Sequence, residues 1–215
     1  MHIAVNIIIT IIAYLLGSIP TSVWISQYFY NIDIRDFGSG NAGATNTFRV
    51  LGVKSGIIVF VIDILKGFAA VNLIHFTNYY IPHSGDYINI QLLLGIAAML
   101  GHIFPIYVRF RGGKGVATLF GVICAISLYP TLIMAGIFVV ILILTRYVSL
   151  SSLIAGLSFP VLIIVIFQET TPSLVIFSLI ISVLMFFTHQ KNIERLLRKE
   201  EKKANILKIV KRRSV

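Results

Sequence analysis

The sequence predicts an all-α polytopic membrane protein, in which several helices cross one lipid bilayer. Three observations support this fold class: 57% of the 215 residues are hydrophobic, only 12% are charged, and the mean hydropathy is +0.93. A soluble domain carries about twice that share of charge. The apolar residues also form long runs, and a helix needs about 20 of them to cross the hydrocarbon layer.

Six apolar runs follow one another, at residues 3–26, 55–77, 90–108, 116–145, 151–168 and 172–188. The first run lacks a basic segment before it and is longer than the apolar part of a signal peptide, so we expect it to be a membrane span. The fourth run has 30 residues, which is too long for one ordinary crossing. Pro130 interrupts this run, and a proline can produce either two short helices or one kinked helix.

The basic residues favour two helices, because cytoplasmic loops carry an excess of Lys and Arg. With a break near Pro130 there are about seven spans, and every Lys and Arg except Lys66 then lies on the side of the C-terminus. We therefore expect the N-terminus outside, the C-terminus in the cytoplasm and glycine-rich cytoplasmic loops. We expect one membrane-embedded domain, 1–215, with a basic cytoplasmic tail at about 190–215.

The net charge of +10 raises the question of which partners are anionic. The basic residues lie in short loops and in the tail, so we expect membrane lipids and anionic substrates, and no nucleic acid. Cys124 is the only cysteine, which excludes an intrachain disulfide. The histidines show no metal-ligand spacing, and we predict neither a metal nor a cofactor.

The first predicted inner loop reads FGSGNAGATNTFR at residues 37–49. Its glycines allow backbone amides to turn inward as an anion-binding nest, and Arg49 adds a forked cation suited to phosphate. The candidate phosphate ligands are Gly38, Ser39, Gly40, Asn41, Gly43, Thr45, Asn46 and Arg49. A flexible linker is the alternative interpretation. A dinucleotide fingerprint is not expected, because no βαβ unit surrounds the glycines.

The second predicted inner loop reads GHIFPIYVRFRGGKGVAT at residues 101–118. It places Lys114 among three glycines directly before the next helix, and a helix N-terminus with free amides and a lysine is a phosphate site. The candidate ligands are Gly112, Gly113, Lys114 and Gly115. Alternatively, Lys114 only anchors the loop at the cytoplasmic surface.

Three smaller groups of polar residues complete the set. Ser151 and Ser152 lie at an expected helix start, where a serine can cap the helix or bind an anion. His189, Asn192 and Arg195 share one face if the last helix continues, and His189 can act as an acid, a base or a donor. An interfacial helix end explains them equally well. The pair of Asp63 and Lys66 marks either a functional interior or a structural ion pair.

These clusters, in this order between these spans, resemble the bacterial acyl-phosphate:glycerol-3-phosphate acyltransferases, the PlsY family. The likeness begins at GSIP (17–20) and continues through GSGNAGATN, DILKG (63–67), GHIFP with GGKGVAT, SLSS (149–152) and residues 189–203. The combination of GSGNxGATN with GGKGVAT is highly specific. Lys199 departs from the family pattern, in which glycine is usual, whereas Glu201 matches it.

The resemblance implies transfer of a fatty acyl group from acyl phosphate to the 1-hydroxyl of sn-glycerol 3-phosphate. The products are lysophosphatidate and inorganic phosphate, in the first acylation of phospholipid biosynthesis. It also implies a bacterial cytoplasmic (inner) membrane location and a functional link to a soluble phosphate acyltransferase that makes the donor. The implied catalytic residues are Ser39, Arg49, Lys114, His189 and Asn192. The implied substrate ligands add His102, Ser151, Ser152 and Glu201 to the two loops.

Two questions stay open at this point. Either His189 or the departing phosphate accepts the proton. A membrane transporter of an organic phosphate such as glycerol 3-phosphate is the alternative function, because broken helices with glycine-rich ends also bind anions in transporters. The polar clusters gather at one face and not at mid-membrane, which favours the enzyme.

Overall fold

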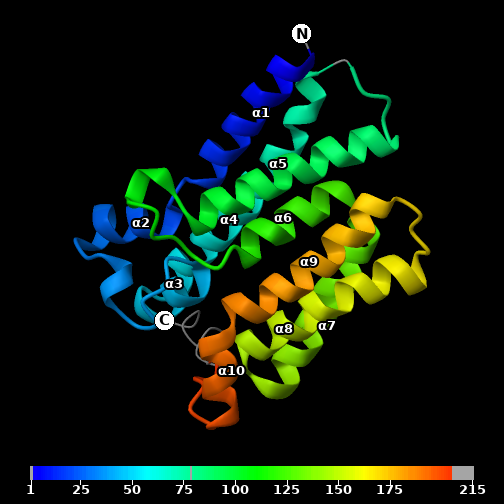
Figure 1. Ribbon diagram of the computed structural model, residues 1–215. Helices are drawn as coiled ribbons and strands as arrows, with labels where there is room; N and C mark the ends of the chain where they lie inside the picture. The colour runs from blue at the N-terminus through cyan, green and yellow to red at the C-terminus, as the bar shows by residue number, and fades with distance from the viewer. Residues whose placement is uncertain (1, 78, 205–215) are drawn as a thin grey trace. The chain divides into compact units, whose positions relative to one another are not determined.

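The computed structural model describes residues 2–77 and 79–204, and within these ranges every regular element is helical (Figure 1). The predicted all-α membrane class is therefore confirmed. The chain divides into two compact units between Leu128 and Tyr129. The single domain expected from the sequence stays a prediction.

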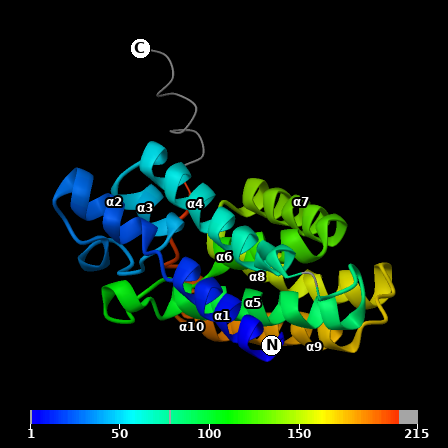
Figure 2. The ribbon, with the colours of Figure 1, turned by 90° about the horizontal axis from the view of Figure 1, so that it is seen from above.

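The described residues of the first unit form six α-helices and three short 3₁₀ turns. The helices are α1 (His2–Gly17), α2 (Thr21–Tyr30), α3 (Ala44–Val50), α4 (Val53–Asn72), α5 (Gly85–Ile103) and α6 (Val116–Ile126). The turns are η1 (Ile34–Asp36), η2 (Leu73–Phe76) and η3 (Ile106–Val108). Helix α1 lies along α5 (Figure 2), and α4 lies along α6.

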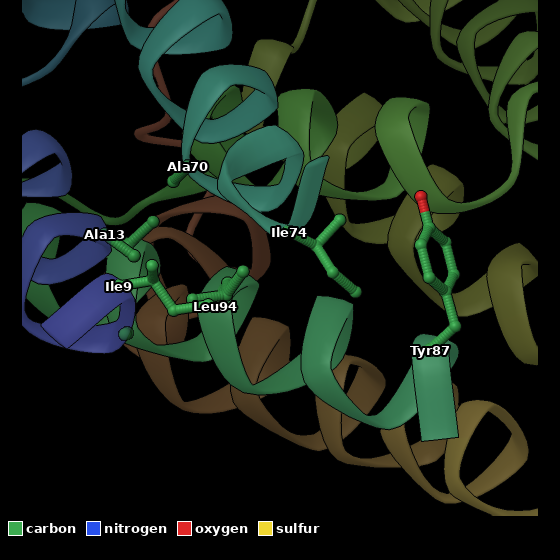
Figure 3. Packing of buried hydrophobic residues seen from close by; sticks show 8 residues of the cluster. Ile9, Ala13, Ala70, Ile74, Tyr87 and Leu94 are labelled. Carbon is green, nitrogen blue, oxygen red and sulfur yellow. The ribbon is translucent and has the colours of Figure 1, made fainter. Parts of the chain in front are cut away.

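The core of this unit joins α1, α4 and α5. Ile9 and Ala13 of α1, Ala70 of α4 and Leu94 of α5 are buried in one cluster, which extends through Ile74 of η2 to Tyr87 of α5 (Figure 3). On the other side of α4, glycines bring two helices into backbone contact. A side chain at Gly121 of α6 would collide with the carbonyl of Ile64 in α4. Small residues allow such close approach between membrane helices.

The first apolar run is not one straight helix. Residues 18–20 separate α1 from α2, and the two helices are bent by 40°. Pro20 precedes α2 and has no amide hydrogen, so it cannot continue the hydrogen-bond ladder of α1. The expected first span is thus a bent pair of helices, which pass together as one candidate span.

The second unit contains α7 (Leu128–Thr145), α8 (Val148–Val161), α9 (Pro172–Thr188) and α10 (Gln190–Leu197). The π-helical turn η4 (Leu162–Ile166) continues α8. Helices α8 and α9 pack together, and the space over Gly156 of α8 is filled by Met185 of α9. A bend of 60° separates α9 from α10.

The 30-residue run at 116–145 consists of two helices. Helix α6 ends at Ile126, Ser127 is extended with φ −148° and ψ 92°, and α7 begins at Leu128. A proline ring collides with the carbonyl four residues earlier, which for Pro130 is that of Ile126. The chain therefore breaks before Pro130, and the proline falls in the first turn of α7.

Within the described residues, four helices are long and apolar enough to cross a membrane, and six spans result if each bent pair counts as one. The four are Val53–Phe76, Gly85–Val108, Leu128–Thr145 and Val148–Ile166. Helix α6 has 11 residues, a length of about 17 Å, against a hydrocarbon core of about 30 Å. The count of seven spans thus stays a prediction.

Candidate active site

The first glycine-rich loop is held from inside by Asn46 of α3. The Asn46 side chain is 2% exposed; it accepts a hydrogen bond from the amide of Ser39 at 2.9 Å and donates to the carbonyls of Ile34 at 3.1 Å and Phe37 at 3.0 Å. Gly38 and Gly40 have φ values of 66° and 71°, a region that favours glycine. The loop is therefore a fixed turn, and Asn46 uses its whole amide to fix it.

The other candidate ligands of this loop differ in their exposure. Asn41 and Gly43 are half-buried, and Gly43 has an extended backbone where α3 begins. The exposed candidates are Gly38, Ser39, Gly40, Thr45 and Arg49. The loop thus presents backbone, a hydroxyl and a guanidinium outward, while Asn46 faces inward as a positioning residue.

The second glycine-rich loop packs against the end of α5. The amide of Gly112 donates to the carbonyl of Ile103 and the amide of Gly113 to that of His102, both at 3.2 Å. Gly115 has φ 77° and precedes α6. Lys114 therefore lies directly before Gly115, the N-cap residue of α6, as the sequence predicted.

The two loops lie against each other within the first unit. A Cβ on Gly113 would come within 2.6 Å of the carbonyl oxygen of Ala42 in the first loop. Arg35 adds a second link, because its Nη1 donates to the carbonyls of Val108 at 3.0 Å and Arg111 at 3.4 Å. Two glycine-rich segments far apart in the sequence thus form one surface.

Arg35 is itself oriented by Asp33. The closest approach is 2.6 Å, between Nη2 and Oδ2, and Nε donates to Oδ1 at 2.9 Å. The hydrogen bonds from Arg35 hold the pKa of Asp33 below its ordinary value, and Asp33 in turn raises the pKa of Arg35. Sequence reasoning missed this pair, although the i, i+2 spacing of opposite charges in DIR was visible.

A network of ionisable side chains lies beneath the second loop. Asp63 and Lys66 form an ion pair at 2.9 Å, with side chains 2% and 4% exposed. Of the two interpretations that the sequence allowed, the structure contains the ion pair. His102 Nδ1 lies 3.1 Å from Thr118 Oγ1 and 3.8 Å from Asp63 Oδ1. His102 therefore joins α5 to α4 and to the first turn of α6.

In the second unit, Glu201 gathers three partners. Its Oε1 accepts hydrogen bonds from Ser149 Oγ and Asn192 Nδ2, both at 2.8 Å, and its Oε2 lies 2.9 Å from Arg195 Nε. The carboxylate thereby ties the tail to α8 and α10. Ser149 and Arg195 were not predicted as its partners; the signal was that Glu201 matches a family motif within a basic tail.

The serines at the start of α8 do not cap the helix. Helix α8 begins at Val148, so Ser151 and Ser152 lie one turn inside it. Ser151 Oγ donates to the carbonyl of Tyr147 at 2.8 Å, and Ser152 Oγ to that of Val148 at 2.9 Å. Both side chains are buried. Of the two interpretations that the sequence allowed, the serine N-cap is therefore wrong.

His189 lies at the bend between α9 and α10. The last helix does not continue straight through it, so His189, Asn192 and Arg195 do not share one helix face as expected. Asn192 and Arg195 remain together on α10 and both contact Glu201. His189 is 3% exposed, and its Nδ1 lies 3.0 Å from the carbonyl oxygen of Met185.

Each predicted residue thus belongs to one of two groups. The first unit contains Gly38, Ser39, Gly40, Asn41, Gly43, Thr45, Asn46, Arg49, His102, Gly112, Gly113, Lys114 and Gly115. The second unit contains Ser151, Ser152, His189, Asn192 and Glu201. No group of three or more potential metal ligands occurs in the part of the chain that the structure describes.

Comparison with known proteins identifies the family. A family model described as glycerol-3-phosphate acyltransferase matches residues 7–199, which include every residue of both groups except Glu201. The chain belongs to the glycerol-3-phosphate acyltransferase family. The resemblance inferred from the sequence motifs is confirmed.

Curated relatives of this acyltransferase agree over most of its length. A glycerol-3-phosphate acyltransferase of Listeria monocytogenes serotype 4b (strain F2365) is 46% identical over 199 residues, covering 92% of this chain and 96% of the relative. One from Chlorobium phaeobacteroides (strain BS1) is 39% identical over 223 residues, covering 91% and 94%. The matches include both units.

Solved structures support the same assignment. The crystal structure of PlsY, an integral membrane glycerol 3-phosphate acyltransferase, in its glycerol 3-phosphate form has a TM-score of 0.82 and 34% identity to this acyltransferase. The match covers 95% of this chain and 98% of that chain. The lysophosphatidic acid form of PlsY gives a TM-score of 0.78.

Proposed function

We infer that this acyltransferase transfers a fatty acyl group from acyl phosphate to the 1-hydroxyl of sn-glycerol 3-phosphate. It releases lysophosphatidate and inorganic phosphate, in the first acylation of phospholipid biosynthesis. Membership of the family supports the reaction, and the glycerol 3-phosphate and lysophosphatidic acid forms of PlsY support its acceptor and product. The observation that carries the inference in this chain is the pair of glycine-rich loops that lie against each other.

Phosphate chemistry explains why such loops suit the reaction. The acceptor hydroxyl attacks the acyl carbonyl, the bond from the acyl carbon to the phosphate oxygen breaks, and the hydroxyl proton passes either to His189 or to the departing phosphate. Phosphate is a good leaving group, so positioning and charge stabilisation supply most of the acceleration. Arg49 and Lys114 are suited to neutralise phosphate, and the Ser39 hydroxyl can donate a hydrogen bond to it. The backbone amides of Gly38 and Gly115 are candidate donors to phosphate, with the side chains of Asn41 and Thr45. The amides of Gly40, Gly43, Gly112 and Gly113 donate to backbone carbonyls, so a phosphate has to compete for these donors.

In the second unit, His189 and Asn192 are assigned to the glycerol hydroxyls and Ser151 and Ser152 to phosphate. A carbonyl can only accept a hydrogen bond, so the contact with Met185 supports a neutral His189 tautomer with its proton on Nδ1. Nε2 then carries the lone pair that a general base needs. The serine hydroxyls donate to carbonyls of their own helix, so a phosphate has to compete for these donors. Asn46 and Glu201 are assigned positioning roles.

The proposed setting is a bacterial cytoplasmic membrane with seven spans, the N-terminus outside and the C-terminus in the cytoplasm. The break before Pro130 supports the split that this topology requires. Helix α6 is then a short span, and its backbone contact with α4 shields it on that side. The donor is supplied by a soluble enzyme that makes acyl phosphate. A transporter is not favoured by the family.

The decisive experiment supplies purified, reconstituted protein with palmitoyl phosphate and glycerol 3-phosphate. Released phosphate and lysophosphatidate should appear in equal amounts, and palmitoyl-CoA, as the control donor, should give no lysophosphatidate. Absence of product from palmitoyl phosphate would overturn the proposal. Product from palmitoyl-CoA alone would mean that the donor has been assigned wrongly.

A further inference from the structure

We propose that Asp63, Lys66, His102 and Thr118 form a buried network that positions the loop at residues 112–115, so that His102 acts as a positioning residue and not as a substrate ligand. The proposal rests on the proposed function, because the loop is assigned there to phosphate.

The His102 ring forms the floor of the loop. Its Nε2 lies so close to Gly113 that a Cβ at this position would collide with it, and the carbonyl of the same residue accepts from the Gly113 amide at 3.2 Å. His102 is 7% exposed. A rotation of the ring would therefore either push the Gly113 peptide outward or leave a gap beneath it. Because Lys114 follows Gly113 directly, such a change would also move Lys114.

Thr118 fixes the orientation of this ring. Its Oγ1 lies 3.1 Å from His102 Nδ1, and the side chain is fully buried in the first turn of α6. His102 lies in the last turn of α5, before the loop, and Thr118 lies in the first turn of α6, after it. The hydrogen bond between them therefore connects the two ends of the segment that carries Lys114.

The ion pair keeps the other side of the ring in place. Asp63 Oδ1 lies 3.8 Å from His102 Nδ1, accepts from Thr21 Oγ1 at 3.2 Å and pairs with Lys66. Lys66 Nζ also donates to the carbonyl of Ile19 at 2.8 Å, in the break between α1 and α2. Unpaired polar groups are costly at membrane depth. The network therefore runs through successive contacts from the α1–α2 break to the loop: Ile19, Lys66, Asp63, His102 and Gly113.

The test compares Thr118→Val with Thr118→Ser in the acyl phosphate assay. Valine keeps the shape of threonine and removes the hydroxyl, whereas serine keeps the hydroxyl. A single neutral hydrogen bond corresponds to a change of about three- to tenfold. Thr118→Val should raise the KM for glycerol 3-phosphate, for acyl phosphate or for both by about this factor, with kcat within about twofold. Thr118→Ser should retain a KM close to wild type.

A purely structural role has a different signature. It lowers the amount of folded enzyme, so the apparent kcat falls while both KM values stay unchanged, and this result for Thr118→Val would overturn the proposal. If Thr118→Val does not fold, His102→Asn provides the same comparison. It keeps an amide near the Nδ1 position and empties the space beside Gly113, so KM should again rise. An inactive wild-type protein would instead refute the proposed function.

Discussion

Asn46 suits the inside of the first loop because a primary amide has one acceptor and two donors on one short side chain. The loop uses all three, on the amide of Ser39 and the carbonyls of Ile34 and Phe37. Gly38 packs directly over this amide, where a Cβ would collide with Oδ1. The shape of the first loop therefore depends on a side chain that faces into the protein.

Replacement of Asn46 by aspartate tests this role, since aspartate keeps the acceptor and removes both donors. Two buried carbonyls then lose their partner, and we expect a loss of about 2–4 kcal/mol in unfolding free energy. Thermal unfolding in detergent measures the change. The matched control is Asn41→Asp, which adds the same charge in the same loop at a half-buried position. Equal stability of the two variants would show that Asn46 does not hold the loop.

Helix α10 ends in a Schellman motif that has Lys199 at the position where glycine is usual. Lys199 has φ 59°; its amide donates to the carbonyl of Leu196 at 3.1 Å, and the amide of Glu200 donates to that of Arg195 at 2.8 Å. These are the two bonds of a Schellman motif, in which glycine usually occupies the left-handed position. The family's usual glycine at this position is thus explained by the backbone. The turn also delivers Glu201 to its partners.

Lys199→Gly should therefore stabilise α10. The left-handed conformation costs about 1 kcal/mol for a residue with a Cβ, and glycine avoids that cost. Hydrogen exchange of the α10 amides should slow by about fivefold, because 1 kcal/mol corresponds to that factor. Arg198→Gly is the control, since Arg198 has an ordinary right-handed conformation and glycine there should speed exchange. Faster exchange in Lys199→Gly would contradict the argument.

The contact between α4 and α6 depends on helix backbones that touch at glycine. A Cβ on Gly121 would collide with the carbonyl of Ile64, whereas one on Gly136 of α7 meets open space. Alanine at Gly121 must therefore separate the two helices, at a cost of about 1–3 kcal/mol.

Thermal unfolding of Gly121→Ala and Gly136→Ala compares the same substitution in two helices. Gly121→Ala should unfold at a lower temperature than wild type. Gly136→Ala should be unchanged or higher, because alanine favours a helix by about 1 kcal/mol over glycine. A wild-type melting temperature for Gly121→Ala would exclude the close helix contact.

Over the whole molecule, sequence reasoning succeeded where the cause is local. The hydropathy of the runs predicts membrane helices, and the clash of Pro130 with Ile126 is a property of neighbouring residues. The Schellman turn and the bend at His189 were harder, because helix ends depend on bonds that the sequence does not display. The bend between α1 and α2 was missed, although Pro20 was visible.

The site was only partly predictable for a similar reason. Glycine-rich motifs indicate where phosphate can bind, but not which polar side chains face inward. Asn46 was read as a phosphate ligand, and its amide holds the loop. Glu201 bonds to Ser149, which is 52 residues away. Such partners depend on tertiary packing, which no periodicity in the sequence predicts.

The central claim is that the loops at 37–49 and 112–115 hold one phosphate together. Calorimetric titration with glycerol 3-phosphate tests it directly in the wild type, in Arg49→Met, in Lys114→Met and in the double variant. Each single variant should bind at least about tenfold more weakly, which corresponds to about 1.4 kcal/mol. The double variant should lose less than the sum of the two, since both cations act on one phosphate. Wild-type affinity in both single variants would contradict the account.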